Sequence, residues 1–193
     1  THQCNEDIAL MRTIPGMVIL NPSDDIEAKA AVKAAYEHEG PVYMRFGRLA
    51  VPIINDRPDY KFEIGKGVTL REGKDVAIIA TGLCVSESLA AAEKLAADGI
   101  DVKVINIHTI KPLDEDLVVA AAKECGKVVT VEEHSVIGGL GSAVCETLSR
   151  KAPTPVKTIG VQDCFGESGP AVALLEKYGL NAEGIYASVK EFV

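Results

Sequence analysis

Hydrophobic positions from residue 75 onward follow a regular alternation of two patterns. Short, nearly continuous apolar runs rich in Val and Ile predict buried strands, and apolar residues at helical spacing between them predict helices. The expected strands span residues 76–80, 102–107, 128–131 and 156–161, and the expected helices span residues 85–97, 114–124, 138–150, 170–178 and 181–192. This alternation predicts a complete small α/β domain, with a mostly parallel sheet covered by helices on both faces.

The first 50 residues carry the same patterns over a shorter stretch. They predict a helix at 5–12, a strand at 17–20, a helix at about 23–39 and a strand at 42–46. Asp24, with Glu27 three residues later, has the spacing of a capping box at the start of the second helix. Two strands and two helices are too few to bury a sheet. Because the chain also opens on Thr1 rather than Met, we expect a partial α/β segment that lacks the front of its domain.

The stretch between these two regions breaks both patterns. Prolines, glycines and charged residues are spread through it from about residue 53 to 74. We interpret it as a linker, with a small hairpin predicted around Gly65 to Arg71. The sequence therefore divides into residues 1–52, a linker at 53–74 and a complete domain at 75–193.

Composition narrows the classes of protein that the chain can represent. Its formal net charge of −8 argues against a sequence-independent nucleic-acid-binding protein, which needs a basic surface against the phosphates. No apolar run approaches the ~20 residues that cross a bilayer. The five cysteines form no CxxC pair and no His–Cys cluster with zinc-ligand spacing. We expect free thiols in a reducing cytoplasm and no metal site in this chain.

Two candidate ligand-binding side chains lie in the first region. Ligands of α/β sheets collect at the carboxyl ends of strands. Arg48 lies just past such an end, after Gly47, and a guanidinium there can give a phosphate two parallel hydrogen bonds. Arg45 competes for this role, although in a continuing strand it would point to the opposite face. His2 is a titratable donor near the chain start. The alternative for Arg48 and His2 is a solvated arginine and a flexible terminal histidine.

Three further segments place glycines or charges at strand ends. GGLG at 138–141 has the position of a phosphate cradle at a helix start, but the full GxGxxG fingerprint is absent, which favours tight strand–helix packing. EEH at 132–134 has groups for acid–base work, but neighbouring strand residues point in different directions, which favours interface or structural hydrogen bonding. The loop DCFGESG at 163–169 has no chemistry that its sequence assigns.

Several motifs occur in the order and spacing of the transketolase family. The starting THQ, then EDIALMR, NPSDDIEAKAA and GPVYMRFGR, resemble the end of the transketolase pyrimidine-binding domain. Farther along, DVAIIATG, INIHTIKPLD, VVTVEEHSVIGGLGSAV and FGESG resemble the carboxyl-terminal domain. The resemblance covers essentially the whole chain and is nearest to the split, small-subunit type of prokaryotic transketolase.

The resemblance implies a role for each region. Residues 1–52 would be the carboxyl-terminal end of a thiamine-diphosphate pyrimidine-binding domain, and residues 75–193 the transketolase carboxyl-terminal domain. It implies that His2 lines the substrate channel and hydrogen-bonds sugar hydroxyls and the reacting centre, and that Arg48 binds the substrate phosphate. It also implies that the intact enzyme uses thiamine diphosphate and Mg, whose ligands lie outside this chain, as does the glutamate that activates the aminopyrimidine.

The implied activity of the intact enzyme is transfer of a two-carbon ketol unit between sugar phosphates, a reaction of the pentose phosphate pathway. The chain by itself is expected to be inactive, and to act with the second subunit of a homodimer or with a separate amino-terminal subunit. Two alternatives stay open. One is a related thiamine-diphosphate enzyme, either a deoxyxylulose-phosphate synthase or the β subunit of a 2-oxoacid dehydrogenase. The other is a non-catalytic module whose last domain serves assembly or binds a small effector.

Overall fold

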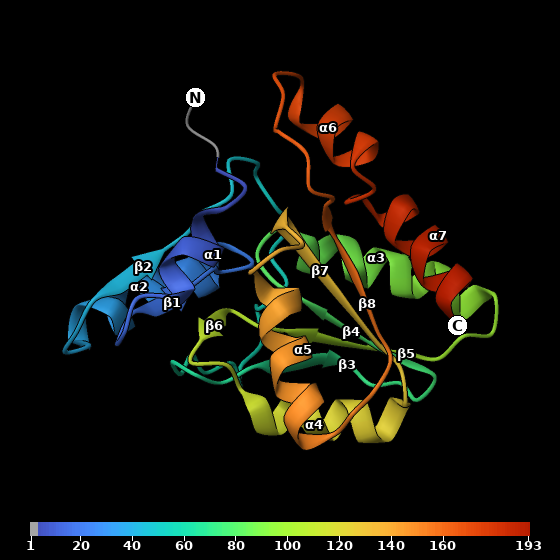
Figure 1. Ribbon diagram of the computed structural model, residues 1–193, viewed down its shortest axis with the longest axis horizontal. Coiled ribbons are helices and arrows are strands. Elements are labelled where there is room, and N and C mark those ends of the chain that lie inside the picture. The colour runs from blue at the N-terminus through green and yellow to red at the C-terminus, as the bar shows by residue number, and fades with distance from the viewer. Residues whose placement is uncertain (1–3) are drawn as a thin grey trace.

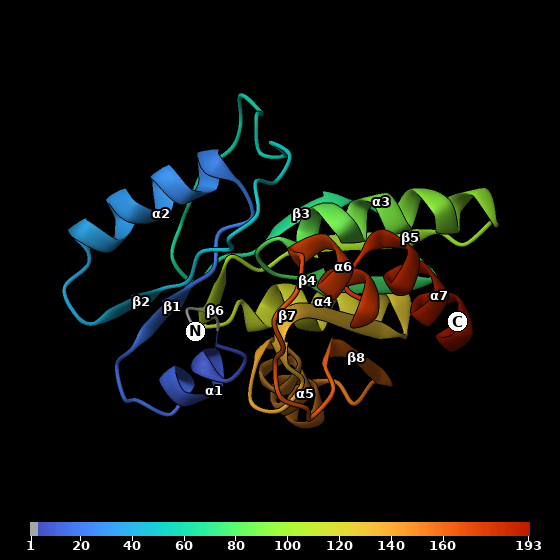
Figure 2. The ribbon, with the colours of Figure 1, turned by 90° about the horizontal axis from the view of Figure 1, so that it is seen from above.

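The chain forms two adjoining β-sheets with helices packed around them (Figures 1 and 2). The structure is a computed structural model and describes residues 4–193. No helix in this part of the chain is long and apolar enough to cross a membrane. The five cysteines are all free thiols. The α/β class predicted from the alternating patterns is confirmed.

The smaller sheet has three strands in the order β2-β1-β6. These strands are β1 (Val18–Leu20), β2 (Val42–Met44) and β6 (Thr109–Lys111). β1 and β2 are parallel, and β6 runs antiparallel to β1. β6 was not predicted, because three residues with a single buried apolar side chain give no readable period. The small sheet therefore gains a strand from much farther along the chain.

The larger sheet has five strands in the order β3-β5-β4-β7-β8. The strands are β3 (Val68–Arg71), β4 (Val76–Ala80), β5 (Val102–Asn106), β7 (Val128–Ser135) and β8 (Val156–Val161). All neighbouring pairs are parallel except β3 and β5, which are antiparallel. The mostly parallel sheet follows from strands joined by helical crossovers.

Helices cover both faces of the larger sheet. On one face, α3 (Cys84–Ala97) and α7 (Ala182–Phe192) pack on Val76, Ile78 and Ala80 of β4. On the other face, α4 (Glu115–Cys125) and α5 (Leu140–Lys151) pack on Ala77 and Ile79. Successive β4 side chains thus enter opposite cores, as the strand period requires.

The hairpin predicted around Gly65 to Arg71 is wrong. β3 is a single strand, and it pairs with β5, where Val68 lies opposite Asn106. An isolated two-stranded hairpin buries too little apolar surface to be stable. The edge of β5 instead offers backbone hydrogen-bond partners to β3 next to the core of the larger domain. Residues 68–71 of the predicted linker therefore join the larger sheet.

The helices of the first region lie on opposite faces of the small sheet. Ile8 of α1 (Asp7–Arg12) packs with Ile19 and Ile110, whereas Ala31 of α2 (Asp25–Glu37) packs with Val18 and Leu20.

The predicted start of α2 is confirmed at Asp24, whose Oδ1 accepts the N–H of Glu27 at 2.8 Å. The return contact of the capping box differs from the prediction. The Glu27 carboxylate accepts the N–H of Ser23 at 2.7 Å, one residue before the cap.

Candidate functional site

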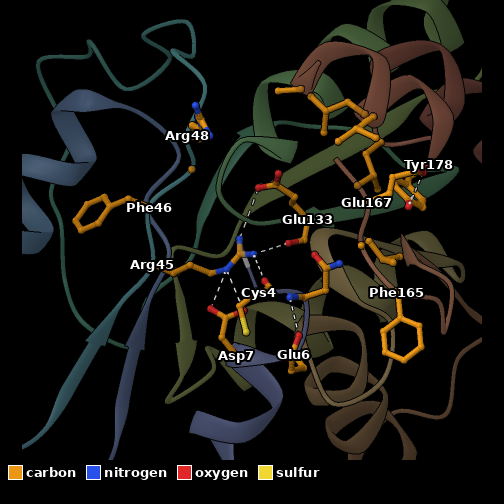
Figure 3. Close-up of a pocket in the computed structure, with 18 of the residues that line it drawn as sticks. Cys4, Glu6, Asp7, Arg45, Phe46, Arg48, Glu133, Phe165, Glu167 and Tyr178 are labelled. Carbon is orange, nitrogen blue, oxygen red and sulfur yellow. Dashed lines mark hydrogen bonds and ion pairs between the residues drawn. The ribbon is translucent and has the colours of Figure 1, made fainter. Parts of the chain in front are cut away.

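A cavity of about 910 Å³ lies between the first region and the larger domain, at the carboxyl end of β2 (Figure 3). Its walls come from residues 4–7, residues 43–48, Glu133 and Val161, and from residues between 165 and 180, which include part of α6 (Ala171–Lys177). The strand end that the sequence singled out for ligand binding is therefore part of a real cavity. One wall of that cavity belongs to the domain after residue 75.

Arg48 lies in this cavity on the loop that follows β2. Its side chain is exposed, and no dashed line joins it to any other cavity residue drawn in Figure 3. A guanidinium that none of these drawn cavity residues engages is available to an anionic ligand. The position predicted for a phosphate-binding arginine is thus geometrically suited to that role.

Arg45 also reaches the cavity but is engaged by the protein itself. Its Nε donates to Asp7 Oδ2 at 3.0 Å, and its Nη2 donates to the carbonyl oxygens of Cys4 at 3.2 Å and Glu133 at 2.7 Å. Its Nη1 also lies 3.7 Å from the Glu133 carboxylate. Strand β2 ends at Met44, so the alternation that would have sent Arg45 to the opposite face does not continue. The rival phosphate ligand considered from sequence is therefore a structural cation.

Asp7, the carboxylate partner of Arg45, was not recognised from the sequence. Only 8% of its side chain is exposed, and it also accepts a 2.8 Å hydrogen bond from the Tyr43 hydroxyl. Burial, reinforced by the Asp7 contact, raises the pKa of Tyr43 to about 12, so this hydroxyl stays a donor at neutral pH. The available signal was an acidic residue at the first turn of a short apolar helix. Such a residue is equally typical of a helix start without a partner.

His2, the other candidate, lies outside the described residues. Its role as a channel residue therefore remains a prediction that rests on the THQ resemblance.

The GGLG segment at 138–141 surrounds a carboxylate of the protein. Glu132 is 1% exposed, and it accepts the N–H groups of Leu140 at 2.7 Å and Gly141 at 2.8 Å. Burial raises the pKa of Glu132 to about 7, against the opposing effect of these two N–H donors. The first N–H groups of α5 are thus occupied by an internal carboxyl group. The structure therefore shows close packing at the glycines and not a phosphate cradle.

In the EEH segment, the side chains of Glu132 and His134 lie on one face of β7, 3.8 Å apart, and that of Glu133 lies on the other, as the period of a strand requires. Glu132 turns under α5, Glu133 turns toward Arg45, and His134 turns toward α1. His134 Nε2 accepts the N–H of Ala9 at 3.3 Å, while Nδ1 lies 2.7 Å from the Ser135 carbonyl oxygen. Burial lowers the pKa of His134, which fits a neutral ring that accepts at Nε2 and donates at Nδ1. The structural hydrogen-bonding interpretation of this segment agrees with the structure.

The loop at 163–169 forms the far wall of the cavity. Phe165 is 98% exposed, while Glu167 accepts a 3.0 Å hydrogen bond from the Tyr178 hydroxyl (Figure 3). Glu167 also forms an ion pair with Lys177. The sequence offered no signal for this placement, because the loop meets residues more than 100 positions away only in the folded chain.

The described residues do not form a site for a metal-bound diphosphate. Within residues 4–193, no group of three or more His, Cys, Asp or Glu side chains is arranged to hold a metal ion. The helix start with a glycine-rich approach is filled by Glu132. That the ligands of thiamine diphosphate and Mg lie outside this chain stays a prediction.

Comparison with protein families accounts for both regions. Residues 65–185 match the family described as "Transketolase, C-terminal domain", and residues 1–53 match "Transketolase, pyrimidine binding domain". The chain belongs to the transketolase family. The family resemblance seen in its motifs is thereby confirmed.

Curated relatives include proteins that are named as transketolase subunits. The "6-deoxy-6-sulfo-D-fructose transketolase subunit SqwH" of Clostridium sp. strain MSTE9 is 47% identical over 99% of this chain and 59% of its own length. One subunit of the apulose-4-phosphate transketolase of Phocaeicola vulgatus is 42% identical over 100% of this chain and 62% of its own length. The chain thus spans about three fifths of the length of these relatives.

A solved structure described as "Split gene transketolase, inactive beta4 tetramer" superimposes with a TM-score of 0.93. It is 52% identical to this chain, and the match covers 98% of this chain and 62% of that one. The two-sheet arrangement is therefore the fold of a known transketolase section.

Proposed function

We propose that this chain is part of a thiamine-diphosphate-dependent transketolase that transfers a two-carbon ketol unit between sugar phosphates. The observation that carries the proposal is the open guanidinium of Arg48 in a cavity at the carboxyl end of β2. The membership in the transketolase family supplies the reaction class, and the cavity supplies a place for an anionic substrate group.

In this proposal Arg48 holds the phosphate of the sugar. A guanidinium can match two phosphate oxygens with parallel charge-assisted hydrogen bonds, which fixes orientation as well as affinity. Arg45 cannot share this work, because its nitrogens already contact Asp7, Cys4 and Glu133. His2 contacts the sugar hydroxyls and the reacting centre in the same proposal, on the strength of the THQ motif.

The cofactor site lies elsewhere in the assembled enzyme. The family resemblance supports ligands for thiamine diphosphate and Mg outside this chain, and among the described residues no group of three or more His, Cys, Asp or Glu side chains could hold a metal ion. The source is either further sequence of the same polypeptide, a second subunit of a homodimer, or a separate amino-terminal subunit. The names of the relatives that are called subunits support the last of these.

The related reaction of a deoxyxylulose-phosphate synthase is the second candidate. The synthase 1 of Geobacter sulfurreducens is 39% identical over the whole chain, below the 47% and 42% of the two transketolase subunits. The higher identities favour ketol transfer.

The test is an activity assay of the full-length gene product together with any separate amino-terminal subunit encoded beside it, thiamine diphosphate and Mg. Two substrate pairs are compared: a ketose phosphate with an aldose phosphate, and pyruvate with glyceraldehyde 3-phosphate. Ketol transfer in the first pair supports the proposal. Turnover of the second pair alone would replace this proposal by the deoxyxylulose-phosphate synthase reaction.

A further inference from the structure

Arg45 connects three segments that are far apart in the sequence. Its guanidinium contacts Asp7 at the start of α1, the Cys4 carbonyl just before it, and Glu133 in β7 of the larger domain. Figure 3 shows these contacts meeting at one side chain on the cavity wall. We infer that Arg45 is a positioning residue, which holds residues 4–7 in place as part of the wall of the substrate cavity. This inference rests on the proposed function, because it assigns Arg45 a role in the same site.

The segment held by Arg45 has few other means of keeping its place. Residues 4–6 precede α1 and belong to no strand or helix. Asn5 and the first turn of α1 meet the larger domain through hydrogen bonds from Ser135 N–H to the Asn5 carbonyl at 2.7 Å and from Ala9 N–H to His134 Nε2 at 3.3 Å, and Arg12 adds a contact at the end of α1. The Arg45 contacts lie beside the first two. They fix the same segment from the β2 side, where the Tyr43 hydroxyl also donates to Asp7 at 2.8 Å. Loss of Arg45 therefore leaves the Cys4 carbonyl without its donor and Asp7 with Tyr43 alone on this side.

The environment of Arg45 makes this connection costly to replace. The side chains of Arg45 and Asp7 are only 14% and 8% exposed. Removing one partner of a buried, hydrogen-bonded charge pair leaves the other charge without compensation. Lysine keeps the charge but has no planar fork, so it cannot reach Asp7, Cys4 and Glu133 together.

The position of this segment matters for chemistry because it walls the cavity and begins two residues after His2 in the sequence. A displacement of about 1 Å in a catalytic arrangement can lower a rate about a hundredfold. Phosphate recognition, by contrast, is assigned to Arg48 on the loop after β2. Loss of Arg45 is therefore expected to lower kcat while the KM for the phosphorylated substrate changes little.

The test compares Arg45→Gln, Arg45→Lys and Arg12→Gln in the full-length, assembled enzyme. Arg12 is a matched control: it also joins α1 to the larger domain, by donating to the Gly138 carbonyl at 2.7 Å, but it does not line the cavity. We expect Arg45→Gln to lower kcat by about tenfold to a hundredfold with KM nearly unchanged. The kcat of Arg45→Lys is expected to lie between those of the wild type and Arg45→Gln. Arg45→Lys keeps the positive charge, so it provides a folded variant for the test even if Arg45→Gln does not fold. Arg12→Gln should keep kcat near the wild-type value.

Hydrogen exchange of the same variants reads the positioning without any turnover. Arg45→Gln and Arg45→Lys should speed exchange in residues 5–9 and at the Ser135 amide, whereas Arg48→Ala should not. Unchanged exchange in both Arg45 variants would overturn the inference, even where ketol transfer itself is absent and the proposed function has failed. A rise in KM as large as that of Arg48→Ala, with kcat intact, would also overturn it and make Arg45 a phosphate ligand.

Discussion

The buried carboxylate of Glu132 accepts a hydrogen bond of 2.7 Å from the backbone N–H of Leu140, in the first turn of α5. A second oxygen accepts the N–H of Gly141 at 2.8 Å. A carboxylate at a helix amino end satisfies donors that lack an intrahelical partner and is favoured by the helix dipole. The position where many α/β proteins bind a phosphate is therefore occupied here by the protein's own carboxyl group, which joins β7 to α5.

The raised pKa of Glu132 predicts a measurable pH dependence of stability. In the folded chain this pKa is about 7, compared with 4.5 for an unperturbed glutamate. Between these values the native state holds a proton that the unfolded state has lost, so the free energy of unfolding falls as pH rises from about 4.5 to 7. The shift corresponds to a change on the order of 3 kcal/mol. Chemical denaturation across this range should show the slope in the wild type.

Glu132→Gln is the matched variant, because an amide has similar size and does not titrate. We expect the wild-type minus variant difference in unfolding free energy to fall through this range and to level off above pH 7. This difference in unfolding free energy also includes any change in the titration of His134, because its Nδ1 lies 3.8 Å from the Glu132 carboxylate. Parallel curves for the two proteins would show that Glu132 keeps an ordinary pKa.

Gly139 leaves the space that the Glu132 carboxylate occupies. A Cβ at this position would overlap Glu132 Oε2 and lie 2.7 Å from His134 Nδ1, although the backbone φ of −82° suits any residue. We expect Gly139→Ala to lower the free energy of unfolding by about 1–3 kcal/mol through overpacking. Gly47→Ala is the control, because its nearest neighbour would be Leu83 at 3.6 Å. Equal thermal midpoints for both variants would contradict the packing argument.

The hydrophobic pattern predicted the larger domain well because each strand and helix there buries a regular face. The four predicted strands and five predicted helices of this region all occur, and Asp114 caps α4 through the Leu117 N–H at 3.2 Å. The pattern failed where a short strand depends on a distant partner. β3 and β6 are defined by their pairing with β5 and β1, which no local period records.

The candidate site was predictable only in part. The end of β2 and Arg48 could be chosen from general rules about strand ends. The division of labour between Arg45 and Arg48 could not, because it depends on Asp7 and Glu133, which reach Arg45 only after folding. Sequence spacing alone cannot show which of two nearby arginines the protein has already neutralised.

The placement of the cofactor outside these residues also gives a prediction. The isolated 193-residue chain should show no Mg-dependent binding of thiamine diphosphate by isothermal titration calorimetry, because the described residues form no metal-ligand cluster. The full-length enzyme with its partner is the positive control. A micromolar dissociation constant for the isolated chain would require a cofactor site that this account does not contain.

The phosphate contact of Arg48 is the central claim about the site, and steady-state ketol transfer by the full-length, assembled enzyme tests it most directly. Loss of a charge-assisted contact costs about 1.5–3 kcal/mol, so Arg48→Ala should raise KM for a phosphorylated sugar roughly 10- to 150-fold. The KM for an unphosphorylated sugar should stay the same in this variant. Arg150→Ala, which removes an exposed arginine of α5 that does not line the cavity, should leave both values unchanged. An unchanged KM for the phosphorylated sugar in Arg48→Ala would contradict the account.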